Sequence, residues 1–312
     1  PRMYEQKRFV KQLVDNREIS KRMMDHLNSI PKHTHLIDAL RSAISLLGHY
    51  DTDSVDNSIC ANQRKSVRLI EQIPTIASTL YRINSNKEMT DPKASGNSSG
   101  NILHMIGVES DEEKIRLLDS VIAVTCDNGM NQSTLALRHA IAAGTDLHSA
   151  VCAAICASKG DREFGAIASV RKMIHEVGDA RHANLEIKTR LKNKERIPGF
   201  GICRGRQDPR TELLKEIAYK HVKKADFETA CTIEKIMEQD TGLRPNVTYY
   251  LGLIHDAIGI PIEMSAPLLV IAAVPGWCAH AIEESSGKGI EMPKQEYSGM
   301  MTQEWVPIQK RR

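Results

Sequence analysis

The loop from Lys194 to Cys203 gathers the groups best suited to chemistry. It contains the turn Pro198-Gly199-Phe200-Gly201, and a second turn leads into a helix start at Asp208-Pro209-Arg210. Two glycines so close together allow positive φ and let backbone N–H groups approach a ligand. The neighbouring Lys and Arg side chains favour an anionic ligand. The loop therefore predicts an anion site, with a plain surface turn as the alternative.

Composition excludes several functional classes. With 312 residues, 41% of them hydrophobic and 26% charged, the chain is long enough for two globular domains. A net charge of +3 and 4% aromatic residues give no indication of a nucleic-acid partner. Apolar stretches such as 266–276 are shorter than the roughly 20 residues of a membrane span. No signal peptide is visible, and seven scattered cysteines indicate reduced thiols, so we expect a cytoplasmic protein.

The elements that must position this loop are helices. Apolar residues recur at the helical period along the chain, and no segment alternates as a strand does, which predicts an all-α protein. Three short helices are expected between residues 3 and 47, and a longer one over 58–86 that Pro74 interrupts. A polar loop or disordered crossing should follow at 85–100. Further helices are expected at 101–106, 111–126, 131–143, 146–157, 210–223, 227–239, 247–258 and 264–285, and an extended arm at 287–312.

Local signals refine this outline. Ser110 is the expected N-cap of the helix over 111–126, whose acidic first turn suits the helix dipole. Cys152 and Cys156 share a helical face without a third ligand nearby in sequence, so we expect core packing and no metal site. His280 lies on a largely apolar helix and is expected to be a packing residue.

Several short sequence motifs follow one another in a recognisable order. They are Asn131-Gln132-Ser133-Thr134, Pro198-Gly199-Phe200-Gly201 with Asp208-Pro209-Arg210, Pro245-Asn246-Val247, Gly259-Ile260-Pro261, Val274-Pro275-Gly276-Trp277 with Ala279-His280 and Glu283, Pro293-Lys294-Gln295-Glu296-Tyr297-Ser298-Gly299, and Trp305-Val306-Pro307-Ile308. In this order and spacing they resemble the citrate synthase family over nearly the whole chain. The resemblance implies that this chain begins some way inside the family's pattern.

The resemblance implies a citrate-synthase-like, all-α fold and a homodimer. A large domain would comprise 1–163 and 260–312, and a small domain over 164–259 would close over the substrates. Family members condense oxaloacetate with acetyl-CoA. In that reaction an Asp removes a methyl proton, one His binds the thioester oxygen and a second polarises the ketone. A third His and several Arg residues hold the oxaloacetate carboxylates. No cofactor is required, and acyl-CoA is the expected type of substrate.

Four positions that carry this chemistry hold other residue types here. By motif correspondence, Glu163 stands for the thioester-binding His and Ile202 for the ketone-polarising His. Asn128 stands for the third His, and Thr248 for the catalytic Asp. Isoleucine donates no hydrogen bond, and a threonine hydroxyl is too weak a base to take a methyl proton unaided. We therefore expect that ordinary citrate synthase activity is absent.

The carboxylate-binding positions are also changed in part. Arg210 is retained, whereas Ala273 and Met292 stand where two further arginines are expected. The residues that remain define a candidate site. Its expected catalytic residues are Glu163, Asn128 and Thr248, its substrate-binding residues are Arg210, Arg204, Arg162 and Asn131, and its CoA-binding residues are Pro198, Gly199, Phe200, Gly201, Asn246 and Arg196.

Two functional hypotheses follow. The first is a diverged enzyme that acts on an acyl-CoA or related carboxylate by rewired C–C bond or acyl-transfer chemistry, with Glu163 as a general base of raised pKa. The second is an inactive pseudoenzyme whose dimer serves as a binding or structural module, with Glu163 paired to Arg162. The first predicts a closed, polar, ligand-sized cleft containing Glu163, Arg204 and Arg210. The second predicts a cleft that is filled, collapsed or left with unsatisfied polar groups.

Overall fold

The protein is all-α, as predicted. The computed structural model describes residues 2–160, 163–201, 208–287, 296–302 and 304–311, and no β-strand occurs among them. Its fourteen α-helices are α1 (Met3–Asp15), α2 (Lys21–Ser29), α3 (Leu36–Leu47), α4 (Ile59–Asn84), α5 (Ser98–Ile106), α6 (Glu112–Thr125), α7 (Gln132–Ala142), α8 (Leu147–Ser158), α9 (Ala166–Val177), α10 (Ala180–Lys192), α11 (Pro209–His221), α12 (Lys224–Thr241), α13 (Val247–Ile258) and α14 (Ser265–Ser286).

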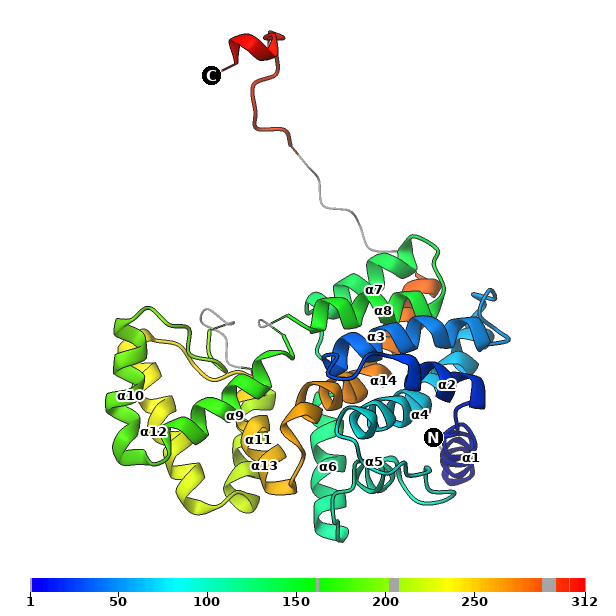
Figure 1. The fold of residues 1–312 in the computed structure, drawn as a ribbon, viewed down its shortest axis with the longest axis horizontal. Coiled ribbons are helices and arrows are strands. Elements are labelled where there is room, and N and C mark those ends of the chain that lie inside the picture. Colours follow the sequence, from blue (N-terminus) through cyan, green and yellow to red (C-terminus); the bar gives the residue numbers. More distant parts are fainter. Residues whose placement is uncertain (1, 161–162, 202–207, 288–295, 303, 312) are drawn as a thin grey trace.

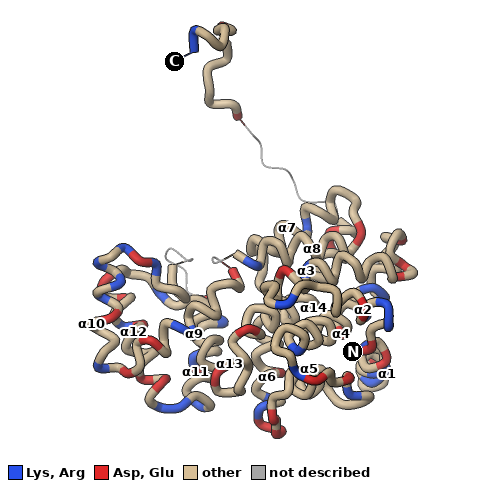
Figure 2. Tube along the Cα trace, viewed as in Figure 1, with Lys and Arg blue, Asp and Glu red and all other residues tan. Residues whose placement is uncertain are grey.

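The helices form two groups side by side (Figure 1). Helices α1 to α8 form the larger group together with α14, and α9 to α13 form the smaller group. The trace of α14 carries no charged residue before its last turn, whereas charges of both signs follow the outer helices of both groups (Figure 2). The boundaries predicted for the two domains, after 163 and after 259, remain a prediction.

Helix α14 is the centre of the larger group. It packs against α4, α6, α7 and α8, and most of its residues from Ser265 to Trp277 are buried. The stretch Ile262–Ser286 is long and apolar enough to cross a membrane by length and composition, but 78% of its most apolar window is buried inside the protein. Its apolar character is therefore accounted for by core packing.

The prediction that Pro74 interrupts a helix is wrong. Helix α4 continues through Pro74, and α14 likewise contains Pro275. Both stretches are buried on most sides, so tertiary packing stabilises a helix despite the hydrogen bond that proline removes. The predicted cap of α6 is also wrong by one residue. Asp111 is the N-cap, and its side chain accepts a hydrogen bond from the backbone N–H of Lys114 at 2.9 Å.

Two further expectations need correction. Cys156 is exposed and does not pack in the core, although Cys152 on the preceding turn is partly buried against it. No helix is expected from the sequence between residues 157 and 210, but the segment after residue 165 folds into α9 and α10. The loop at 85–97 is tied down because Arg17, buried against Glu71, donates hydrogen bonds to the carbonyl oxygens of Lys93 and Gly96.

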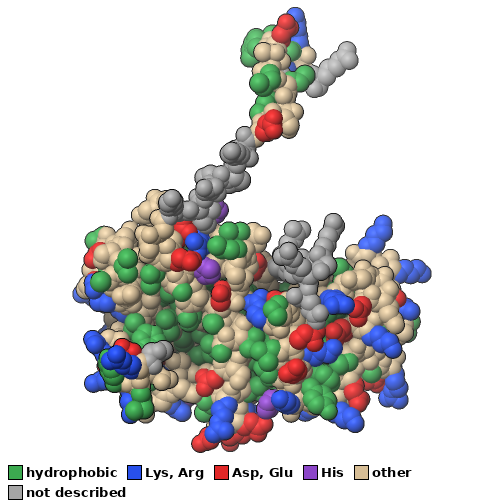
Figure 3. Space-filling model, turned by 180° about the vertical axis from the view of Figure 1, so that it is seen from behind, with side chains coloured by type: hydrophobic (Ala, Val, Ile, Leu, Met, Phe, Trp, Pro, Cys, Tyr) green, Lys and Arg blue, Asp and Glu red, His purple; other side chains and the backbone are tan. Residues whose placement is uncertain are grey.

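The C-terminal arm leaves the body of the molecule (Figure 1). Its described residues form no α-helix, only the 3₁₀ turn Ile308–Lys310, in agreement with the expected extended arm. Apolar side chains lie along it (Figure 3), and those most exposed to solvent are Tyr297, Met300, Met301, Trp305 and Ile308.

Candidate functional site

Four of the predicted site residues lie at the N-terminal ends of three helices: Asn131 at α7, Arg210 at α11, and Asn246 and Thr248 at α13. Each helix begins with an N-cap residue from a sequence word singled out above: Asn131, Asp208 and Asn246 respectively. The capping side chain satisfies backbone N–H groups that the first turn leaves without partners. Residues chosen for their possible chemistry therefore also have a structural role.

Glu163 is held at the start of α7. Asn131 Oδ1 accepts a hydrogen bond from the Thr134 backbone at 3.0 Å, which directs its Nδ2 toward Glu163. That Nδ2 donates to Glu163 Oε2 at 2.9 Å, and the backbone N–H of Gln132 donates to Oε1 at 3.2 Å. Burial raises the pKa of Glu163 above its usual value, and these two hydrogen bonds oppose the rise only in part. A carboxyl group of this kind is suited to proton transfer.

Arg210 joins the start of α11 to the loop between α6 and α7. Its guanidinium donates to both carboxylate oxygens of Asp208, with Nε to Oδ1 at 3.0 Å and Nη2 to Oδ2 at 2.7 Å. Its Nη1 donates to Asn128 Oδ1 at 2.7 Å. Burial alone would raise the pKa of Asp208, but the hydrogen bonds and charge of Arg210 bring it below the usual value. The Arg210 guanidinium, which could bind a substrate carboxylate, is thus already hydrogen-bonded within the protein.

The turn at Pro198–Gly201 is packed against α13. Gly199 has φ of +84°, and a Cβ built on it would lie 2.7 Å from the ring of Tyr249. Its carbonyl oxygen accepts a hydrogen bond from the backbone N–H of Asn246 at 2.8 Å, and Phe200 forms a bridge with Pro245. Glycine is therefore needed here for close backbone packing, whether or not a ligand also binds.

Thr248 takes part in the cap of α13. Its hydroxyl donates to Asn246 Oδ1 at 2.7 Å, and its backbone N–H donates to the same oxygen at 3.0 Å. No described carboxylate or imidazole is bonded to this hydroxyl, so nothing in that part of the chain activates it as a base. Its place in the structure is that of a capping residue.

A polar cluster beside Asn128 was missed from the sequence. His280 Nδ1 lies 3.0 Å from Nη1 of Arg138, and its Nε2 lies 3.3 Å from Asp127 Oδ1. Because a guanidinium only donates, the ring proton is on Nε2 and faces Asp127. Arg138 also pairs with Glu284 at 2.7 Å, and Glu284 is almost fully buried. The signal available in the sequence was the spacing of His280, Glu283 and Glu284 on an otherwise apolar helix.

Close packing fixes the loop that carries Asn128. A Cβ built on Gly276 of α14 would lie 2.0 Å from the carbonyl oxygen of Cys126, so only glycine allows this approach. The Gly129 backbone N–H and then His280 and Arg210 lower the pKa of Asp127, although partial burial opposes them. The loop is therefore anchored on both sides of Asn128.

The structure brings some predicted residues into contact and leaves others apart. Glu163 contacts Asn131, Asn128 contacts Arg210, and Asn246 contacts Thr248 and the Gly199 turn, giving three local clusters. No hydrogen bond or ion pair joins one cluster to another among the described residues. Arg196 is exposed. Arg162, Ile202, Arg204 and Met292 lie outside the described residues, so the predicted pairing of Glu163 with Arg162 stays a prediction.

Comparison with known proteins places this geometry in context. A family model described as "Citrate synthase, C-terminal domain" matches residues 1–294. A citrate synthase of Deinococcus radiodurans is 32% identical over 100% of this chain and 85% of its own length. A citrate/2-methylcitrate synthase of Bacillus subtilis is 30% identical over 88% of this chain and 77% of its own.

Solved structures agree in fold. The crystal structure of citrate synthase from Thermotoga maritima has a TM-score of 0.86 and 30% sequence identity, covering 100% of this chain and 85% of that chain. A citrate synthase from Pyrobaculum aerophilum has a TM-score of 0.84 with 26% identity, covering 100% of this chain and 82% of that chain.

Proposed function

Because the chain belongs to the citrate synthase family, we propose that it binds an acyl-CoA or a related carboxylate metabolite and performs a reaction other than citrate synthesis. The observation that carries this proposal is Glu163. By motif correspondence it occupies the position of the family's thioester-binding His, and its carboxylate is half-buried with a raised pKa. Its two hydrogen bonds offset this burial only in part, and a carboxylate in such surroundings is costly unless it is used.

Glu163 would act as the general base. With a raised pKa it would accept a proton from the carbon next to a thioester carbonyl more readily than an ordinary carboxylate does. Asn131 and the Gln132 backbone hold its two oxygens, so the side chain is fixed in orientation before any ligand binds. The enolate so formed would be the nucleophile for C–C bond formation or would be reprotonated.

The acyl-CoA would bind along the turn at Pro198–Gly201 and the start of α13 at Asn246, with Arg196 near its phosphates. This assignment rests on the sequence motifs that match the family and on the exposure of Arg196. We also propose a cytoplasmic homodimer, in keeping with the family. Light scattering of the purified protein tests the dimer, and a monomer at micromolar concentration contradicts it.

The test of the reaction is hydrogen exchange on the substrate. Acetyl-CoA and propionyl-CoA are incubated with the protein in D₂O, and loss of the α-proton signal is followed by NMR. We expect exchange that Glu163→Gln abolishes and that the exposed-site control Glu109→Gln retains. Release of CoA is measured in parallel with oxaloacetate present, and we expect none. Citrate formation at a normal rate, or exchange that persists in Glu163→Gln, refutes the proposal.

A second candidate function is a non-catalytic binding module. The specific observation in its favour is Arg210, whose guanidinium already pairs with Asp208 and Asn128. A site whose polar groups are paired within the protein needs no ligand to satisfy them. Calorimetry distinguishes the two candidates: binding of acyl-CoA without any α-proton exchange supports the module, and binding with exchange supports the enzyme.

A further inference from the structure

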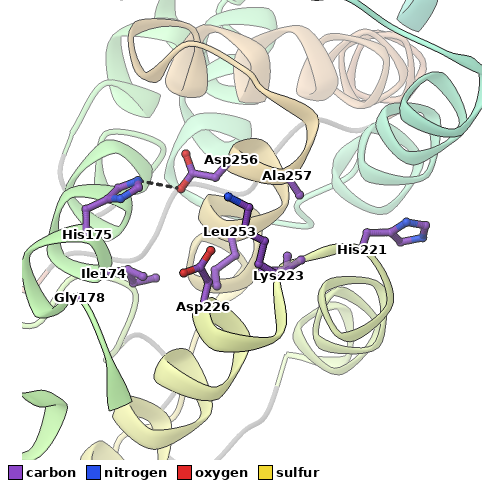
Figure 4. Close-up of a pocket in the computed structure, with 10 residues that line it drawn as sticks. Ile174, His175, Gly178, His221, Lys223, Asp226, Leu253, Asp256 and Ala257 are labelled. Carbon is purple, nitrogen blue, oxygen red and sulfur yellow. Dashed lines mark ion pairs between the residues drawn. The ribbon is translucent and has the colours of Figure 1, made fainter. Parts of the chain in front are cut away.

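A cavity of about 470 Å³ lies within the smaller helical group, apart from the candidate site. Its walls come from α9, α11, α13 and the start of α12 (Figure 4). This volume is within the range of small-molecule sites in proteins, roughly 300–1,000 Å³.

The cavity sits at the opposite ends of the helices that carry the candidate site. His175, His221 and Ala257 line it from the last turns of α9, α11 and α13, whereas Arg210 and Thr248 lie in the first turns of α11 and α13. Arg210 and His221 are 11 residues apart along α11, and Thr248 and Ala257 are 9 residues apart along α13. At the rise of an α-helix these separations are roughly 17 and 14 Å. The cavity is therefore a separate site.

An apolar floor lies beneath two charged side chains. Ile174 and Leu253 are almost fully buried, and Ala257 is partly exposed beside them. Lys223 and Asp226 extend from the start of α12 next to Leu253 (Figure 4). Neither Lys223 nor Asp226 makes a side-chain hydrogen bond or ion pair with another described residue. One cation and one anion are thus available above an apolar surface.

The other charged groups of the cavity are already paired. Asp256 is bound by Arg171, whose Nε donates to Oδ1 at 2.8 Å, and by His175, whose Nε2 lies 3.3 Å from Oδ2. His221 points away from the remaining lining residues in Figure 4 and pairs with Glu113 at 3.1 Å. Lys223 and Asp226 therefore decide the charge that a ligand must bring.

We propose that this cavity binds a small zwitterion, an α-amino acid with an apolar side chain. The ligand's carboxylate pairs with Lys223, its ammonium group pairs with Asp226, and its side chain covers Ile174, Leu253 and Ala257. A simple anion would satisfy Lys223 and be repelled by Asp226, and a simple cation would meet the reverse situation. Only a ligand with both charges and an apolar part matches all three features.

Isothermal titration of the full-length protein tests the proposal. The probes are L-leucine, isocaproate, which lacks the ammonium group, isoamylamine, which lacks the carboxylate, and glycine, which lacks the apolar side chain. We expect leucine to bind at millimolar concentration or below and each of the others to bind roughly fivefold more weakly or worse, since each loses one contact. Absence of any leucine heat, or equal binding of isocaproate or isoamylamine, overturns the proposal.

Variants locate the binding. Lys223→Gln and Asp226→Asn are surface changes that leave the fold intact, and each should weaken leucine binding roughly fivefold. Lys235→Gln on the same helix and Glu216→Gln on α11 are exposed controls that should change nothing. Ala257→Leu fills the cavity and should abolish binding, with thermal unfolding measured to confirm that this variant is folded. Leucine binding that neither Lys223→Gln nor Asp226→Asn weakens places the ligand elsewhere and refutes the assignment.

Discussion

His255 should make the stability of this protein sensitive to mild acid. The residue lies in α13 with its side chain fully buried, and neither ring nitrogen has a hydrogen-bond partner among the described residues. Burial, and then the positive charge of Arg171, lower its pKa to about 3. In the unfolded chain the same imidazole has a pKa near 6.5. The perturbation that tests this is His255→Leu, which removes the titrating group.

The sign follows from proton binding. Between about pH 3 and pH 6.5 the unfolded chain protonates this histidine and the folded protein does not, so acidification favours unfolding. One pH unit within this window is worth about 1.4 kcal/mol. Lowering the pH from about 7.5 to about 5 should therefore remove about 2 kcal/mol of stability, and the whole window about 5 kcal/mol. The contribution is fully present above the unfolded pKa.

Urea unfolding at the two pH values provides the assay. Other groups also titrate, so the quantity of interest is the loss of stability in the wild type minus the loss in His255→Leu. We expect this difference to be about 2 kcal/mol, whatever the stability of His255→Leu at neutral pH. His139→Leu, at an exposed position, is the control and should behave as the wild type. Equal pH dependence in the wild type and His255→Leu would refute the reasoning.

Two further predictions concern the candidate site. Gly276→Ala should destabilise the protein by about 2 kcal/mol or more in thermal unfolding, because its new Cβ would overlap the Cys126 carbonyl oxygen. Gly160→Ala is the control, since its new Cβ would meet only the Ala157 carbonyl oxygen, at 3.6 Å. Asp208→Asn keeps the cap of α11 but removes the charge that pairs with Arg210. The Arg210 guanidinium is then freer to bind a carboxylate, so malonate should bind a few-fold more tightly by calorimetry. Unchanged malonate affinity would show that Arg210 is not accessible to a carboxylate.

Much of the fold could be predicted from the sequence because helix faces are local patterns. The helix at Val247–Ile258 agrees with its prediction residue for residue, and most others agree within a few residues. Pro74 was misjudged since its effect depends on burial, which a local pattern does not record. No helix is expected from the sequence over 166–192, although α9 buries an apolar face that includes Ile167, Val170 and Ile174.

The residues of the candidate site could be predicted from the sequence, but their hydrogen-bond partners could not. Motif correspondence singled out Glu163, Asn128 and Arg210. That Glu163 is held by Asn131, 32 residues earlier, is a tertiary contact that no spacing rule gives. The pairing of Arg210 with Asp208 spans only two residues and could have been anticipated from the Asp-Pro-Arg word.

The capping residues affect how evolutionary relatedness is recognised from sequence motifs. Asn131, Asp208 and Asn246 would each be required to start a helix even in a protein with no reaction to perform. Sequence motifs built around such residues can be retained in evolution because folding alone requires them. They identify ancestry, whereas the reaction must be judged from neighbouring positions that are not themselves N-caps, such as 163 and 248.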